Sequence, residues 1–230
     1  MFDKIVRVAS HFEKNINNIG CEVHISTDFL QMKTAVDNLG DHITPHFNPK
    51  FNTFFREFAF WIGLYSESEC VGMCACKLQP LGTENLASYI QRYWLQTYGP
   101  DSLNEIKFAA EQKDSLRDIK GNLVYAGEFR VSKDFARTRL NELLLDYAKL
   151  AIFSHWPNTD FIYLFTRKRD ARRGMFSRTG MNRVINDAIN WEMHPSQAEP
   201  DYSLGLLDRQ GFEEWLIDEL RFQAEPELIE

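Results

Sequence analysis

The sequence predicts an α/β fold in which a mixed β-sheet contains a central parallel βαβ unit and is flanked by helices. Two apolar segments, 122–131 and 161–166, are rich in the aromatic and β-branched residues typical of strands. Between them, from Arg139 to about Ser154, the polar residues form one narrow stripe on an otherwise apolar helix. Strand, helix and strand in this order predict parallel strands joined by a right-handed crossover.

The other elements are expected before and after this unit. In chain order they are an amphipathic helix at 2–17, a strand at 21–26, a helix from the N-cap at 26–28 to Gly40, a short helix at 51–58, an antiparallel hairpin at 58–79, a strand at 189–193, and a helix at 208–222 that follows a loop holding Pro195 and Pro200. We expect a single domain over 1–230, with an N-terminal helix in 1–20 and a helical insertion at 82–121.

The insertion carries a group of aromatic side chains near helical spacing, namely Tyr89, Tyr93, Trp94 and Tyr98. Packing against the body of the domain is the expected role, and the alternative is the wall of an acceptor or acyl-chain pocket.

Composition restricts the classes of protein that remain. The 230 residues are 44% hydrophobic, but the apolar runs are too short to span a bilayer and the N-terminus lacks the order of a signal peptide. We therefore predict a cytoplasmic protein without a membrane partner. Of the four cysteines, Cys74 and Cys76 share a strand face, and no second pair or nearby histidine completes a zinc site. Buried small hydrophobes are expected there, and no metal.

The turn after the first strand of the unit, 132–140, is where a βαβ fold binds an anion at a helix N-terminus. The turn contains neither the G-x-G-x-x-G of dinucleotide-binding folds nor the G-x-x-x-x-G-K-[ST] of a P-loop. Those two classes of nucleotide-binding protein are therefore disfavoured.

Three segments, VYAGEFRVSKDFARTRLNELLLDYA, DFIYLFT and DARRGMFSRTGM, resemble motifs of the GNAT superfamily of acyl-CoA-dependent N-acyltransferases. The resemblance covers about 60 of the 230 residues, from 122 to 181, which it identifies as an acyl-CoA-binding core. It implies a GNAT-like sheet, acetyl-CoA or a longer acyl-CoA as co-substrate, and a small-molecule amine as acceptor. A divergent member is implied, similar to the autoinducer and N-acyl amino acid synthases, whose turns are also poor in glycine.

The resemblance also implies site residues. CoA contacts fall on Phe129, Val131, Ala136, Arg137, Thr138, Arg139, Leu140, Asn141, Thr166, Gly174 and Phe176. Arg139 and Asn141 occupy positions that are glycine in the family, where glycine gives phosphate close access to the backbone. Either the arginines bind CoA in an altered geometry, or CoA binding is weakened or lost.

Proton transfer has several candidates. The family's frequent general-acid tyrosine falls on Phe176, which has no hydroxyl, so water, Ser177 or Tyr163 are the substitutes. For the general base the candidates are Glu128 and Tyr125. Spacing from the strand end favours Tyr125, whereas a bulge would return Glu128 to the cleft face. The alternative role of Glu128 is a structural ion pair with Arg130 or a neighbouring strand.

Charge is concentrated next to this core. The segment 167–183 holds seven basic residues and one Asp, a net charge of +6, whereas the whole chain is −7. A cradle for CoA phosphates, a dock for an acyl carrier protein, a nucleic-acid contact and a solvated arginine helix are the competing interpretations. Nucleic acid is the weakest, because the acidic remainder would repel it. Within this segment Gly174 is predicted inside a helix, where it makes room for the pantetheine arm or for packing.

Two functions follow from these observations. The first is an N-acyltransferase that moves an acyl group from acyl-CoA, or from an acyl carrier protein, to an amine. The second is a non-catalytic GNAT-like module that binds acyl-CoA or a protein partner. The acceptor, the acyl length and the oligomeric state are not predicted.

Overall fold

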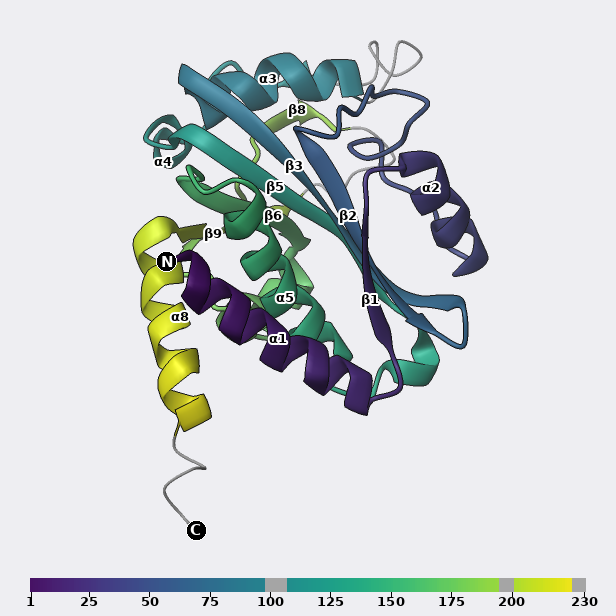
Figure 1. Cartoon of the computed structure of the whole chain (residues 1–230). Coiled ribbons are helices and arrows are strands. Elements are labelled where there is room, and N and C mark those ends of the chain that lie inside the picture. Colours follow the sequence, from purple (N-terminus) through teal and green to yellow (C-terminus); the bar gives the residue numbers. More distant parts are fainter. Residues whose placement is uncertain (98–106, 195–200, 225–230) are drawn as a thin grey trace.

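The computed structural model describes residues 1–97, 107–194 and 201–224 (Figure 1). These residues form a seven-stranded sheet of order β1-β2-β3-β5-β6-β9-β7 and a two-stranded sheet of β4 and β8. The strands are β1 (Glu22–Ser26), β2 (Ala59–Ser66), β3 (Glu69–Asn85), β4 (Lys107–Phe108), β5 (Lys120–Val131), β6 (Phe161–Arg167), β7 (Arg183–Ile185), β8 (Trp191–Met193) and β9 (Tyr202–Asp208). The helices are α1 (Phe2–Asn18), α2 (Phe29–Asn38), α3 (Leu86–Thr97), α4 (Asp114–Arg117), α5 (Leu140–His155), α6 (Lys168–Arg172), α7 (Met175–Arg178) and α8 (Arg209–Ala224), with a 3-10 turn η2 at Lys133–Phe135.

The predicted mixed α/β class and the βαβ unit are confirmed. β5 and β6 are parallel, while every other described neighbouring pair of strands is antiparallel. The parallel ladder is short, because it joins only Leu123–Tyr125 to Phe161–Tyr163. β5 then continues to Val131 and β6 to Arg167 without a shared ladder. The two strands therefore separate toward their carboxyl ends, and we call this break in the sheet the wedge.

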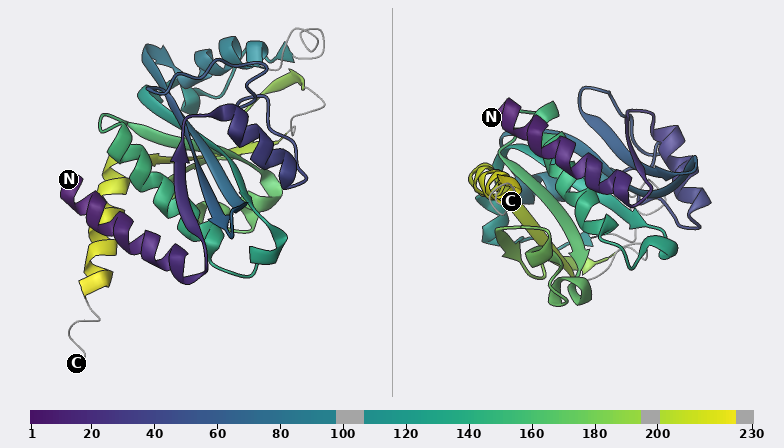
Figure 2. Two further views of the ribbon diagram at one scale, coloured as in Figure 1. Left: turned by 45° about the vertical axis from the view of Figure 1, so that its right-hand side comes forward. Right: turned by 60° about the horizontal axis from the view of Figure 1, so that its bottom comes forward.

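Helices cover both faces of the sheet (Figure 2). On one face α1, α5 and α8 share a core with the sheet, and α1 contributes Ile5, Val8, Phe12 and Ile16 to it. On the other face α2, α3 and the segment 39–58 form a second core. Because both faces are covered, strands such as β2 and β3 are apolar on both sides.

The N-terminal predictions are confirmed in detail. α1 and β1 lie where the sequence indicated, and Asp28 caps α2 by accepting hydrogen bonds from the backbone N–H of Leu30 at 2.9 Å and of Gln31 at 3.1 Å. Gly40, just after α2, has φ +70°, the left-handed conformation expected of a helix-terminating glycine.

Two predictions about elements are wrong. Residues 51–58 form turns instead of a helix, because Phe54 stacks on Phe29 with ring centroids 3.9 Å apart and the segment folds around that contact. In the C-terminal part, the sequence indicated only a loop before the last helix, yet Tyr202–Asp208 form β9 between β6 and β7. The predicted strand at 189–193 is present as β8, in the smaller sheet. Pro195 and Pro200 lie outside the described residues.

The segment 82–121 contains α3, β4 and α4. Tyr89 and Trp94 of α3 are buried in the second core, and Tyr93 packs against it, so the expected packing role is confirmed for these three. Tyr98 lies outside the described residues.

Candidate functional site

A β-bulge in β5 lies at the wedge. Ala75 pairs with Gly127 and Met73 with Arg130, so one residue of β3 faces two of β5, Glu128 and Phe129. Glu128 has φ +56°, a conformation rare for residues other than glycine. After this extra residue, the side chains of β5 that would have faced one side of the sheet face the other.

The bulge places Glu128 and Tyr125 on the same face of the sheet. The Glu128 carboxylate contacts Thr44, and the Tyr125 ring stacks on Phe47, both in the segment 39–58. Phe129 instead packs against the core on the α5 side, as does Val131. The sequence allowed a bulge in this strand as one of two alternatives, and the bulge is observed.

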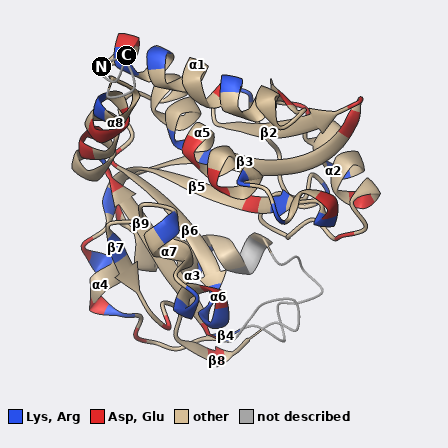
Figure 3. Cartoon of the chain, turned by 90° about the horizontal axis from the view of Figure 1, so that it is seen from below, with Lys and Arg blue, Asp and Glu red and all other residues tan. Residues whose placement is uncertain are grey.

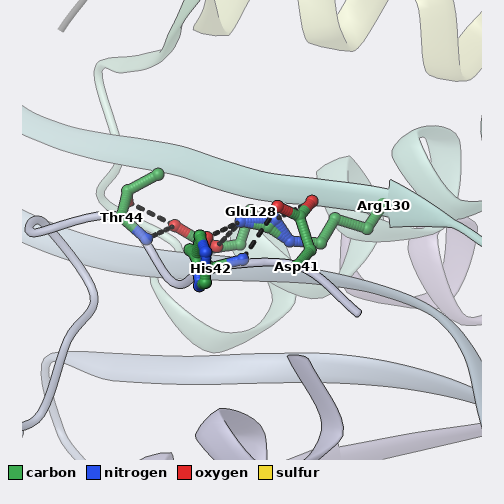
Figure 4. A network of polar contacts seen from close by, with 5 residues as sticks. All are labelled: Asp41, His42, Thr44, Glu128 and Arg130. Carbon is green, nitrogen blue, oxygen red and sulfur yellow. Dashed lines mark hydrogen bonds and ion pairs between the residues drawn. The ribbon is translucent and has the colours of Figure 1, made fainter. Parts of the chain in front are cut away.

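Glu128 is held by a polar network (Figure 4). Its Oε1 accepts hydrogen bonds from the Thr44 backbone N–H at 3.0 Å and from the Thr44 hydroxyl, and its Oε2 lies 2.7 Å from Nη2 of Arg130. Burial raises the pKa of the Glu128 carboxyl, while the Arg130 charge and the Thr44 hydrogen bonds oppose that rise. The ion pair with Arg130, one of the two expected roles of Glu128, is present.

Tyr125 is the last residue of β5 that pairs with β6, so it lies at the apex of the wedge. It is directly opposite Lys77 on β3 and Tyr163 on β6, and its ring centroid is 5.1 Å from that of Tyr163. The Tyr163 hydroxyl donates to Gln79, and burial raises the pKa of Tyr163 well above its ordinary value. Ser177 is exposed on α7.

The predicted phosphate turn runs from η2 into the first turn of α5. Ala136, Arg137, Arg139 and Asn141 are exposed, whereas Leu140 is buried beneath them. Arg139 is the N-cap of α5 with φ −81°, so its backbone conformation does not require glycine. Thr138 accepts a hydrogen bond from the Leu140 N–H at 3.2 Å through its hydroxyl. Arg139 and Asn141, the two residues expected at glycine positions of the resemblance, are therefore both exposed in this turn.

Across the wedge, β6 leads into two short helices instead of the single predicted one. Gly174 separates α6 from α7 with φ +82°, a left-handed turn that explains the glycine and corrects its predicted place inside a helix. The Thr166 hydroxyl lies 3.0 Å from Sδ of Met175. Phe176 is buried in the core with α5, and its ring occupies the space above Gly205. It is therefore a core side chain.

Basic residues are concentrated on α6 and α7, which follow the end of β6 (Figure 3). Five of them are exposed, namely Arg167, Arg169, Arg172, Arg173 and Arg178. Lys168 pairs with Asp187 at 2.8 Å, and Arg183 donates to the Ser115 carbonyl at 3.0 Å. Arg137 and Arg139 are exposed in the turn that follows β5, so exposed positive charge follows both strands of the wedge at their carboxyl ends.

A groove of about 1370 Å³ lies beside the end of β5, between α2, the β2–β3 hairpin and residues 130–135. No sequence pattern indicates this groove, because its walls come from segments far apart in the chain.

No cluster of potential metal ligands is present in the described residues, and Cys74 and Cys76 are buried free thiols within the core. No helix in the described part of the chain is both long and apolar enough to cross a bilayer.

No protein-family profile and no curated protein matches this sequence. Solved structures do match it. FeeM, an N-acyl amino acid synthase from uncultured soil microbes, has a TM-score of 0.48 and 11% identity over 84% of this chain and 93% of its own. Arabidopsis thaliana NAA60 in complex with acetyl-CoA has a TM-score of 0.47 and 12% identity over 82% and 99%.

Another match is a GNAT-family putative acetyltransferase from Desulfovibrio desulfuricans, with a TM-score of 0.44 and 12% identity over 82% of this chain and 98% of its own.

Proposed function

We propose that this chain is an N-acyltransferase that moves an acyl group from acyl-CoA to a small-molecule amine in the cytoplasm. The observation that carries the proposal is the wedge between β5 and β6, because its apex at Tyr125 adjoins a bulge that turns the Glu128 carboxylate to the same face. An elongated thioester needs such a passage through a sheet, with a proton acceptor on one side.

The phosphates of CoA would bind at the open end of the wedge. There the N-terminus of α5 offers backbone N–H groups and a positive dipole end, and Arg137 and Arg139 add charge-assisted contacts. The exposed arginines of α6 and α7 supply further positive charge on the opposite side.

The thioester carbonyl would be polarised by the backbone of β5. The Ser132 N–H donates to the Val71 carbonyl on β3 at 2.7 Å, and successive N–H groups of a strand point to opposite sides. The Val131 N–H is therefore directed at the open edge of β5, where it would stabilise the oxyanion.

The amine nitrogen would attack the carbonyl carbon, and the C–S bond would break to release the CoA thiolate. The amine proton would pass to Glu128, directly or through a water, since Arg130 and Thr44 fix this carboxylate and burial raises its pKa. Tyr125 is the alternative acceptor. The thiolate would take its proton from solvent, since Phe176 lies in the core.

A second candidate function is a non-catalytic module that binds acyl-CoA or a protein. It is favoured by the complete burial of the Glu128 side chain, both of whose oxygens contact protein groups. The Arg139 and Asn141 side chains at glycine positions favour it as well.

The experiment has two steps. Thermal shift with CoA, acetyl-CoA and a long-chain acyl-CoA measures binding, because a ligand specific to the native state raises Tm. Thiol release in the presence of an amine panel then measures turnover, with an acylated carrier protein as an alternative donor. Thiol release that is lost in Glu128→Gln or Tyr125→Phe supports the enzyme. A shift without thiol release supports the module. No shift with any of the three CoA compounds, together with no thiol release from an acylated carrier protein, contradicts the enzyme and the acyl-CoA-binding form of the module.

A further inference from the structure

Lys77 of β3 is buried without an acidic partner. Its side chain is 7% exposed, and its Nζ donates to the His46 carbonyl at 3.1 Å. The Nζ also lies 4.9 Å from the ring centroid of Tyr93 and 5.6 Å from that of Phe47. Within residues 1–97, 107–194 and 201–224 no carboxylate lies within 4 Å of this nitrogen. Buried lysines are normally paired, so this amine lacks its usual counter-charge.

A pocket of about 290 Å³ opens beside Lys77, between β3, α3 and the segment 53–59. Its walls include Phe54, Tyr89 and Tyr93. Phe55 and Phe58 also line the pocket and are exposed. The walls are therefore aromatic, while one amine from the sheet supplies a cation.

The pocket lining also contains one ion pair, which does not alter the net charge of the lining. Arg92 Nη2 lies 2.8 Å from Oε2 of Glu84, so these two charges neutralise each other. Lys77 is left as the lining cation without a paired anion.

We propose that this pocket binds a small apolar carboxylate, whose carboxylate group pairs with Lys77 and whose apolar body lies against the aromatic walls. The ligand would supply the anion that the protein does not. The pocket lining comes from β3, α3 and the segment before β2, and it includes none of the residues assigned to CoA binding or proton transfer. Lys77 faces Tyr125 across the β3–β5 ladder, so the pocket adjoins the apex of the wedge, but the inference does not rest on acyl transfer.

The groups around Lys77 define how binding should depend on pH. Burial lowers the pKa of Lys77 to about 7, and burial and the Lys77 charge lower the pKa of His46 well below 6.5. Burial raises the pKa values of Tyr89 and Tyr93 above 10. The remaining neighbours are Tyr125, across from Lys77 on β5, and the Glu84–Arg92 pair. Lys77 is therefore the group whose charge changes between pH 6 and pH 8.

The test is calorimetric titration of the full chain with octanoate, and with octanol as the uncharged ligand of the same chain length. Octanoate should bind more tightly than octanol. Because the ligand requires the protonated amine, its Kd should be about tenfold higher at pH 8 than at pH 6, while that of octanol should not change. Equal affinity for the two ligands, no octanoate binding, or a flat pH profile would each overturn the proposal.

Substitution gives a second readout. Lys77→Met keeps the length of the side chain and should remove the preference for octanoate, whereas Lys107→Met, at an exposed lysine paired with Glu192, should leave it unchanged. Wild-type affinity for octanoate in Lys77→Met would overturn the proposal. If that variant does not fold, the pH profile of the wild-type protein still decides.

Discussion

Arg130 reaches back along β5 to Glu128 and places Nη2 2.7 Å from the carboxylate Oε2 across the bulge. The same guanidinium donates to the His42 carbonyl at 2.6 Å and lies 3.2 Å from the Asp41 carboxylate. Glu128 in turn accepts from Thr44. The bulge is therefore tied to the loop that covers it, and the position of the candidate base depends on residues some 85 positions earlier in the chain.

Glu128→Gln should destabilise the protein by about 2 to 3 kcal/mol, because it removes the buried carboxylate beside the Arg130 guanidinium and leaves only the exposed Asp41 as an anionic partner, while keeping a hydrogen-bond acceptor for Thr44. Urea unfolding measures the change. Glu192→Gln, which removes an exposed partner of Lys107, is the matched control and should stay within about 0.5 kcal/mol of wild type. Equal losses in the two variants would contradict a structural role for the buried pair.

The left-handed backbone of Glu128 can be tested separately from its charge. Glu128→Gly and Glu128→Ala both remove the carboxylate, but only alanine has a Cβ that strains φ +56°. The glycine variant should therefore be more stable than the alanine variant by about 1 kcal/mol. In an ordinary strand the alanine variant would be the more stable of the two. An alanine variant as stable as the glycine variant would argue against the left-handed backbone of the bulge.

Lys77 should give the stability of the protein a definite pH dependence. Its pKa is about 7 in the folded protein and near 10.4 when unfolded, so between these values the unfolded chain binds more protons and stability rises with pH. From pH 7 to pH 9 the free energy of unfolding of wild type should increase by about 2 kcal/mol relative to Lys77→Met. Parallel pH profiles for the two proteins would show that burial does not shift this lysine.

Gly205 and Phe176 should be strongly coupled. A Cβ at Gly205 would overlap the Phe176 ring, so Gly205→Ala should cost about 2 to 3 kcal/mol through overpacking. In a Phe176→Leu background, where the ring is absent, the same substitution should cost at least 1 kcal/mol less. Additive losses in the double-mutant cycle would mean that the ring does not occupy this space.

Arg137 should matter more than Arg139 for acyl-CoA affinity. Both are exposed at the phosphate turn, but Arg139 shares its charge with Glu142, whose carboxylate lies 3.2 Å from its Nε. Arg137→Gln should raise Kd about tenfold, and Arg139→Gln should raise it less. Arg56→Gln, far from the turn in sequence and exposed, is the control. The reverse order of Arg137 and Arg139 would place the phosphates nearer the start of α5.

The βαβ unit was predictable because its strands and helix are long and strongly patterned. The bulge at Glu128 was foreseeable only as an alternative, since one inserted residue leaves no mark in a sequence where both faces are buried. The helix predicted at 51–58 is absent, and one of its phenylalanines, Phe54, instead stacks on Phe29, more than 20 residues away in the sequence. β9 was missed because its neighbours are β6 and β7, and no local turn marks it.

Some of the site residues were also predictable from the sequence, and others were not. The sequence was sufficient to place Arg137 and Arg139 in the turn at 132–140, because this turn directly follows the predicted strand. Lys77 was missed, because a single lysine in a strand usually lies at the surface. One signal was available: the run from Val71 to Ala75 is apolar on both faces, which marks β3 as a central strand and any lysine within it as buried.

The position of α1 has a consequence for synthesis on the ribosome. The apolar stripe of α1 packs against α5 and α8, which are translated more than 120 residues after it; its residues are Ile5, Val8, Phe12 and Ile16. Until then this amphipathic helix lacks the two helices that cover its apolar stripe, and part of that stripe stays open to chaperones or to other nascent chains. Co-translational folding of this protein must therefore wait for α5, and a chain arrested before residue 140 should be the form most prone to aggregate.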